Sequence, residues 1–272
     1  MRIIMALIAL SAGMAALASS AETTSWDDIR TSLYGDRILQ PAADLIVLDA
    51  PYRSAEDART VVGARLQAPQ GDALTKVILV IDENPMPVSA VFELSEPQDN
   101  FRFETTMRLN GPSNIHVIAE TVAGETLVTE QFVKTSGQGA CSAPPGTDPE
   151  LALATLGDMT IGIVGRNNGV SSGQWLADLA NRQLQMKVDI RHPSHSGMQM
   201  DQISMLFIPM RYVETVRIDL DGRSYIGVTG SISLSENPQI TLSIPAATAR
   251  VDVTMTDTDG TITQASRSLA EY

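Results

Sequence analysis

Cysteine is almost absent from this chain, because Cys141 is the only one among 272 residues. An internal disulfide is therefore impossible, and the paired cysteines of a structural zinc site are also missing. Histidine is scarce, with three residues, and we find neither a glycine-rich phosphate loop nor a Gly-x-Ser-x-Gly motif. We therefore expect no cofactor, no metal and no familiar catalytic constellation.

Positive charge is also in short supply. Lys and Arg number 19 against 32 Asp and Glu, which gives a formal net charge of −13. Such a surface repels phosphate backbones and anionic lipids, so we expect neither nucleic acid nor membrane as a partner. Beyond the N-terminus, no apolar run is long enough to span a bilayer.

The N-terminus has the order of a secretory signal peptide. A positive start at Met1-Arg2 precedes an apolar run over Ile3–Leu10, and Ser19-Ser20-Ala21 supplies the small residues of a cleavage site. We expect residues 1–21 to be removed, with cleavage after Ala21. The mature protein is then exported.

Short strands and turns dominate the rest of the first half. A helix is expected to begin at Ser25 and to end at Gly35. Apolar runs or alternating patterns then predict strands over 45–48, 61–66, 77–81, 101–109, 115–121 and 126–133. Turns about every ten residues are typical of a β-sandwich, predicted here over residues 22–134.

The composition changes over residues 135–149, which read TSGQGACSAPPGTDP. No apolar side chain larger than Ala or Pro is available to pack, so we expect a flexible linker. Cys141 lies in it, and an exposed thiol is favoured over a buried small hydrophobe. No Lys or Arg lies within six residues of Cys141 to stabilise a thiolate.

The second half, residues 150–272, repeats the β pattern after a short helix-like connector at 149–156. Strands are expected over 159–164, 184–190, 213–220, 224–228, 240–244, 251–255 and 261–263. Two Asp-Gly turns, at 221–222 and 259–260, indicate hairpins. The length favours two cores, so the predicted class is all-β with two sandwich domains and a short N-terminal helix.

The three histidines give no firm chemistry. His116 alternates within a strand and is interpreted as a packed or solvated strand residue. His192 and His195 could share a metal, but a third ligand is not evident, so a turn rigidified by Pro193 and Gly197 is favoured. A Cys-His catalytic pair stays open if this turn folds over Cys141.

Three motifs resemble a known family of sulfur carriers. The segment SGQGACSAP around Cys141 resembles the Gly-Gly-Cys-Gly-Gly arm of SoxY, and RHPSHSGMQMD, Arg191 to Asp201, resembles the His-Pro motif of SoxZ. VIDENPMPVSAVFEL, Val80 to Leu94, is similar to the Asn-Pro hairpin of SoxY-like domains. With both halves on one chain, the protein resembles the fused SoxYZ-like carriers associated with quinoprotein dehydrogenases.

The resemblance implies two immunoglobulin-like sandwiches and a periplasmic carrier that is not itself an enzyme. Cys141 would hold sulfur intermediates as a thiosulfonate or persulfide. His192, Pro193 and Gly197 carry over as motif positions that shape the domain interface. The partners would be periplasmic sulfur-oxidising enzymes and cytochromes, or a quinoprotein dehydrogenase system.

Two other hypotheses remain beside the covalent carrier. The protein could be a non-covalent accessory or binding module for a periplasmic quinoprotein dehydrogenase system, with Cys141 incidental. A redox-sensing thiol protein is a weaker third, since without a resolving cysteine it could pair only between molecules.

Overall fold

The structure is a computed structural model that describes residues 25–137, 139–164 and 183–269. The predicted signal peptide, residues 1–21, lies outside the described residues. Helix α1 spans Ser25–Tyr34, which confirms the helix expected to begin at Ser25. Among the helices of the described residues, none combines the length and hydropathy needed to cross a membrane.

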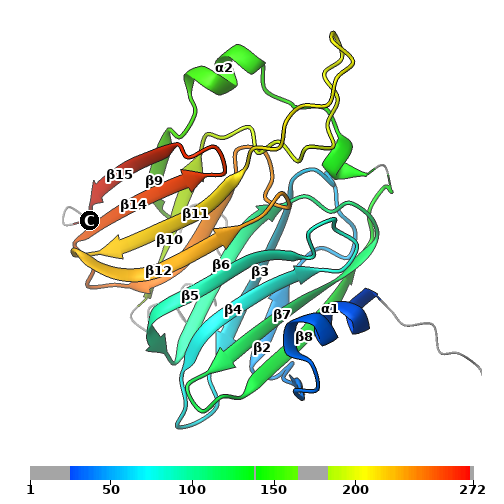
Figure 1. The fold of residues 1–272 in the computed structure, drawn as a ribbon. Helices are drawn as coiled ribbons and strands as arrows, with labels where there is room; N and C mark the ends of the chain where they lie inside the picture. The colour runs from blue at the N-terminus through cyan, green and yellow to red at the C-terminus, as the bar shows by residue number, and fades with distance from the viewer. Residues whose placement is uncertain (1–24, 138, 165–182, 270–272) are drawn as a thin grey trace, which may run out of the picture.

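Two sheets pack face to face, and the predicted all-β sandwich architecture is confirmed (Figure 1). The nine-stranded sheet has the order β1 (Gln40–Pro41), β8 (Thr126–Val133), β7 (Ser113–Thr121), β4 (Leu74–Ile81), β5 (Val88–Gln98), β12 (Arg223–Gly230), β11 (Val213–Leu220), β14 (Arg250–Asp257) and β15 (Ile262–Ser268). The six-stranded sheet has the order β2 (Ile46–Asp49), β3 (Thr60–Gln67), β6 (Asn100–Met107), β13 (Gln239–Pro245), β10 (Gln183–Ile190) and β9 (Met159–Ile163).

Both sheets run across the boundary between the two halves of the chain. In one sheet β5 pairs antiparallel with β12, which places Phe92 opposite Val228. In the other, β6 pairs antiparallel with β13, which places Phe103 opposite Leu242. Each half thus covers an edge of the other that would otherwise expose unpaired backbone groups.

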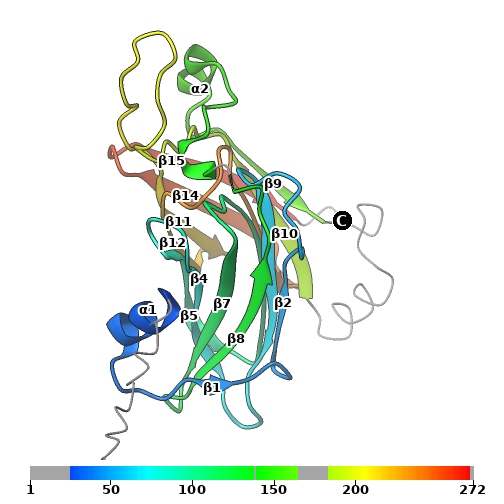
Figure 2. The same cartoon turned by 90° about the vertical axis from the view of Figure 1, so that its right-hand side faces the viewer.

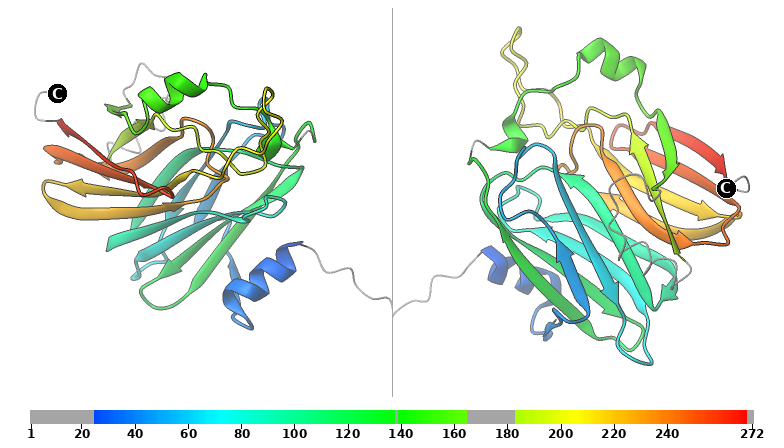
Figure 3. Two further views of the ribbon diagram at one scale, coloured as in Figure 1. Left: turned by 45° about the horizontal axis from the view of Figure 1, so that its top comes forward. Right: turned by 180° about the vertical axis from the view of Figure 1, so that it is seen from behind.

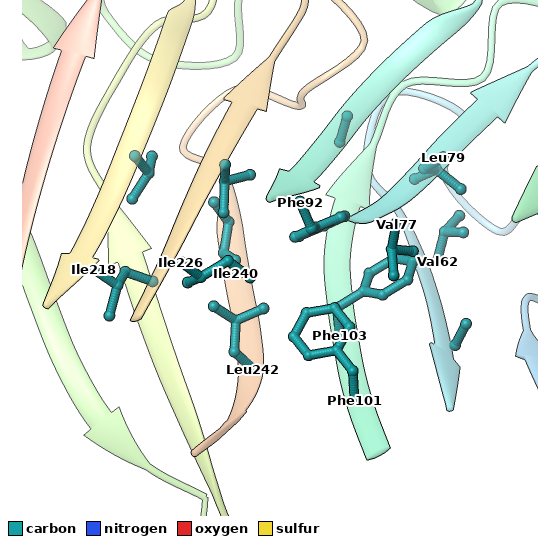
Figure 4. Packing of buried hydrophobic residues seen from close by; sticks show 14 of the residues in the cluster. Val62, Val77, Leu79, Phe92, Phe101, Phe103, Ile218, Ile226, Ile240 and Leu242 are labelled. Atoms are coloured by element: carbon teal, nitrogen blue, oxygen red, sulfur yellow. The ribbon is translucent and has the colours of Figure 1, made fainter. Parts of the chain in front are cut away.

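A single apolar core fills the space between the sheets, where the length of the chain had favoured two. Phe92, Phe101 and Phe103 of the first half lie in the same buried cluster as Ile226 and Leu242 of the second (Figure 4). The rings of Phe92 and Phe103 have centroids 4.4 Å apart. Because sheet residues alternate in direction, one face of each strand supplies this core.

Helix α1 covers the outer face of the nine-stranded sheet. Trp26 and Ile29 pack against Val80 and Ile118, which point away from the main core. The Trp26 ring also stacks on His116, with centroids 3.7 Å apart. His116 is thus a buried, packed strand residue.

Several loops gather at one end of the molecule (Figures 2 and 3). They include a 3-10 turn at Ala140–Ser142, helix α2 at Pro149–Ala154, and a projecting hairpin from Met198 to Met210 closed by a bridge between Met200 and Phe207. Helix α2 agrees with the connector predicted at 149–156. This end carries Cys141.

Candidate functional site

Cys141 is buried, and the prediction of an exposed thiol is wrong. Its exposed fraction is 0%, and the neighbouring Ala140 is buried as well. The segment has no large apolar side chain of its own, but the atoms that cover it come from other parts of the chain. Because Ala and Cys are small, their turn can pack closely against those atoms. The predicted linker is therefore docked at this point.

The first half of the chain holds the turn from one side. The side-chain oxygen of Asn110 accepts a hydrogen bond from the Cys141 amide, at 3.3 Å. Asn84, from the Asn-Pro motif, is buried and fixes this region: its Oδ1 accepts from the Asn110 amide and its Nδ2 donates to the Arg108 carbonyl, both at 2.8 Å. The motif thus positions the residue that binds Cys141.

The second half holds the turn from the other side. The Ser196 hydroxyl donates to the Cys141 carbonyl, and Gln199 Nε2 donates to the Ala143 carbonyl at 2.9 Å. Ser196 and Gln199 are both buried. They lie in the His-Pro motif segment, but no sequence pattern singled them out as site residues. The two halves therefore meet on the cysteine-bearing turn.

His192, Pro193 and Gly197 build the motif turn and make no hydrogen bond to Cys141. His192 Nδ1 accepts from the Ser194 amide at 2.9 Å, so its Nε2 carries the proton and donates to Asp257, at 3.3 Å. Gly197 has a φ of +80°, a left-handed conformation that glycine adopts without strain. Pro193 is buried beside them. Their proposed role at the domain interface stays a prediction.

Burial lowers the pKa values of the two histidines in this turn. Burial lowers the pKa of His192 to about 4, although the hydrogen bond to Asp257 opposes the shift, so the ring is neutral near pH 7. Burial also lowers the pKa of His195, which contacts Gln199 at 3.2 Å. We find no group of three or more His, Cys, Asp or Glu side chains placed to bind a metal within the described ranges.

The thiol itself is held in its protonated form. Burial raises the pKa of Cys141, and the positive charge of Arg108 offsets part of that rise. The sequence offered no such cation near Cys141, because Arg108 arrives only through folding. Arg108 is one of the polar residues that alternate with apolar ones in the strand predicted over 101–109, yet its exposed fraction is 2%.

A pocket of about 260 Å³ adjoins the cysteine-bearing turn. Its lining includes Arg59, Arg108 and Glu236, together with Ala140 and Ala143 from either side of Cys141. A larger pocket of about 500 Å³ contains neither Cys141 nor the motif residues. The smaller pocket is therefore the one that adjoins the cysteine-bearing turn.

Two family models match the chain. The model of the sulfur oxidation protein SoxY matches residues 30–141 and so ends on the single cysteine, and that of the sulphur oxidation protein SoxZ matches residues 176–268. A search among curated proteins found no match for this chain.

Solved structures give weaker similarities. The sulfur carrier protein SoxY from Chlorobium limicola f thiosulfatophilum is 19% identical over 41% of this chain and 96% of its own, with a TM-score of 0.33. A β-glucuronidase from Parabacteroides merdae and a β-glycosidase from Bacteroides vulgatus are each 8% identical over 82% of this chain, but only 24% of theirs, with TM-scores of 0.24 and 0.22. At these scores the structural similarities carry no functional argument.

The family matches agree with the motifs and with the fold. The SoxY match contains Asn84 and Asn110 and reaches Cys141, and the SoxZ match contains the turn that carries Ser196 and Gln199. The chain therefore belongs to the fused SoxYZ-like proteins, with a SoxY domain followed by a SoxZ domain.

Proposed function

We propose that this protein is a periplasmic carrier that holds sulfur intermediates covalently on Cys141 and presents them to partner enzymes of sulfur oxidation. The observation that carries the proposal is the convergence of both domains on the only cysteine. The SoxY match ends on Cys141, and Ser196 of the SoxZ domain binds its carbonyl. The predicted signal peptide supports the periplasmic location.

The loading step balances in atoms and electrons. The Cys141 thiol and thiosulfate form a sulfur–sulfur bond and together lose one proton and two electrons. The electrons go to a partner oxidant of the haem-protein class, and the product is a thiosulfonate on Cys141. The carrier supplies the thiol, while partners supply the oxidation and any later hydrolysis.

A buried thiol must be uncovered before it can react. The contacts that hold the turn include the bonds from Ser196 and Gln199 and the bond to Asn110. The residues before it include Gly137 and Gly139, which have φ values of +79° and +72° and can change conformation at little cost. We infer a docked resting state and an open state in which Cys141 meets its partner.

The neighbouring hairpin supports contact with partners at this end. Its exposed large apolar side chains are Met198, Met200, Ile203, Met205, Leu206, Phe207 and Met210. Exposed apolar patches of this kind mark interaction sites, and methionine-rich surfaces adapt to several partners. A carrier that visits more than one enzyme needs such a surface.

Intact-protein mass spectrometry tests the proposal. Protein purified from its native host without reductant should carry extra sulfur on Cys141, as one or more sulfur atoms or a sulfonate, which a reductant removes. Cys141→Ser and Cys141→Ala should abolish sulfur-dependent activity in the host while the variants stay folded. Ser142→Ala, in the same turn, is the matched control and should retain both activity and adduct.

The opposite result would favour the accessory module. A bare thiol that stays bare with thiosulfate and periplasmic extract, together with full activity of Cys141→Ala, would rule out covalent carriage. Activity of that variant in a quinoprotein dehydrogenase assay would then assign the second function.

A further inference from the structure

Arg108 is a buried cation that donates its hydrogen bonds to backbone carbonyls. Its exposed fraction is 2%, and its Nη1 donates to the backbone carbonyls of Ile232 and Leu234, at 3.2 and 2.6 Å. Over the described ranges of the chain, no Asp or Glu side chain forms an ion pair with it. Because burying a guanidinium without a counter-charge is costly, the position calls for an anion.

Arg59 presents a second guanidinium to the same pocket. Its Nη1 donates to the carbonyls of Glu236 and Asn237, at 2.7 and 2.9 Å. Arg59 and Arg108 both line the 260 Å³ pocket, and backbone carbonyls fix both. Guanidinium groups held in place in this way suit the oxygen atoms of an oxyanion.

Two carboxylates also line the pocket, and neither contacts Arg108 directly to neutralise its positive charge. The Glu236 carboxylate accepts from the amides of Gly146 and Thr147, at 2.7 and 2.8 Å. Glu56 is exposed to solvent. Arg108 therefore has electrostatic interactions with Glu236 and with Cys141, but no carboxylate among the described residues forms an ion pair with it.

The pocket adjoins the residues that flank Cys141, and Arg108 in its lining has an electrostatic interaction with Cys141. Ala140 and Ala143, on either side of that residue, form part of its wall. Its volume of about 260 Å³ is enough for a small sulfonate group. The closed turn leaves no exposed surface on Cys141, so an added group needs such a space.

We propose that this pocket is the binding site for the negatively charged sulfonate end of the species carried on Cys141, with Arg108 and Arg59 as its ligands. The inference rests on the covalent carriage proposed above. The loaded carrier then supplies the counter-charge that Arg108 lacks, and the loaded turn is more firmly docked than the empty one. The pocket thereby selects anionic cargo over neutral cargo.

Two thiol reagents test this binding site without any natural substrate. Sulfonatoethyl methanethiosulfonate and propyl methanethiosulfonate each react with a thiolate to form a disulfide and release methanesulfinate. The first leaves an anionic tail on Cys141 and the second a neutral tail of similar length. After loading is verified by intact mass, dithiothreitol releases each tail, and the same release from urea-unfolded protein gives the baseline ratio of rates.

Dithiothreitol can attack a tail that is bound in the pocket only when the turn opens. We expect the anionic tail to be released roughly tenfold or more slowly than the neutral tail relative to that baseline, the scale of one charge-assisted hydrogen bond. Arg108→Gln and Arg59→Gln should each bring the ratio towards the baseline, and Arg108→Lys should retain part of it. Arg217→Gln removes an exposed arginine outside the pocket and should change nothing.

The proposal is overturned if wild-type protein releases both tails in the baseline ratio, a result that needs no variant to fold. It is also overturned if Cys141→Ala binds free thiosulfate while the attached sulfonate gains no protection, because the pocket is then a site for free anions. Failure to find native sulfur on Cys141 would defeat the carrier function but leave this result standing.

Discussion

The Ser196 hydroxyl donates a hydrogen bond to the Cys141 carbonyl and so joins the SoxZ domain to the cysteine at the end of the SoxY match. In separate chains such a contact would require association. Here the fusion supplies it within one molecule. The contact makes docking of the cysteine-bearing turn a property of both domains at once.

Weakening this contact should expose the thiol. We expect Ser196→Ala and Gln199→Ala each to increase the rate at which Cys141 reacts with Ellman's reagent by roughly two- to tenfold, the effect of losing one hydrogen bond. The absorbance of the released thiolate measures the rate. Ser204→Ala, in the exposed hairpin, is the control, and equal rates in all variants would contradict the docked resting state.

Alkaline pH should destabilise the protein through Cys141. Its pKa is raised in the folded state by burial, so the neutral thiol favours folding below the ordinary thiol pKa of about 8.5. As pH rises above that value the unfolded state ionises first, and this stability is lost through the folded pKa. Urea denaturation from neutral to alkaline pH measures the loss, which should be smaller in Cys141→Ala. An identical pH dependence in both proteins would contradict it.

Acid should weaken the motif turn through His192. Its pKa is lowered from 6.5 to about 4 by burial, so stability should fall as pH drops from 6.5 towards 4, because only the unfolded state takes up the proton. The full effect is on the order of 3 kcal/mol. Urea denaturation of His192→Gln should show a shallower fall over this range, and His195→Gln reports separately on the second histidine. If the stability of His192→Gln fell as steeply as that of the wild type, His192 would not be the cause of the acid sensitivity.

Gly197 should resist substitution more than another glycine with the same backbone. Its φ is +80°, and an added Cβ would lie 3.1 Å from Met210 Cβ. Gly197→Ala should therefore cost about 1–2 kcal/mol in backbone strain, plus the cost of crowding. Gly222 has a φ of +78° with nothing within 4 Å, so Gly222→Ala isolates the backbone term. Thermal unfolding compares the two, and an equal loss would mean that Met210 moves aside freely.

Much of the architecture followed from local patterns. The alternation of Phe101 and Phe103 with polar residues predicted β6, and the run that includes Val77 predicted the buried strand β4. The single core did not follow, because edge pairing between β5 and β12 joins segments far apart in the chain. Local periodicity says which face of a strand is buried, but not which strand lies beside it.

The same distinction between local sequence and tertiary structure holds for the candidate site. The sequence by itself determined that this chain has one thiol, that the thiol lies between two β-rich halves, and that the His-Pro and Asn-Pro segments carry the family resemblance. Only the tertiary structure decided that Cys141 is buried, that Ser196 binds its carbonyl and that the charge of Arg108 acts on it. The reason is physical: composition describes what a segment can bury of itself, whereas burial and electrostatic environment depend on groups that folding brings from elsewhere in the chain.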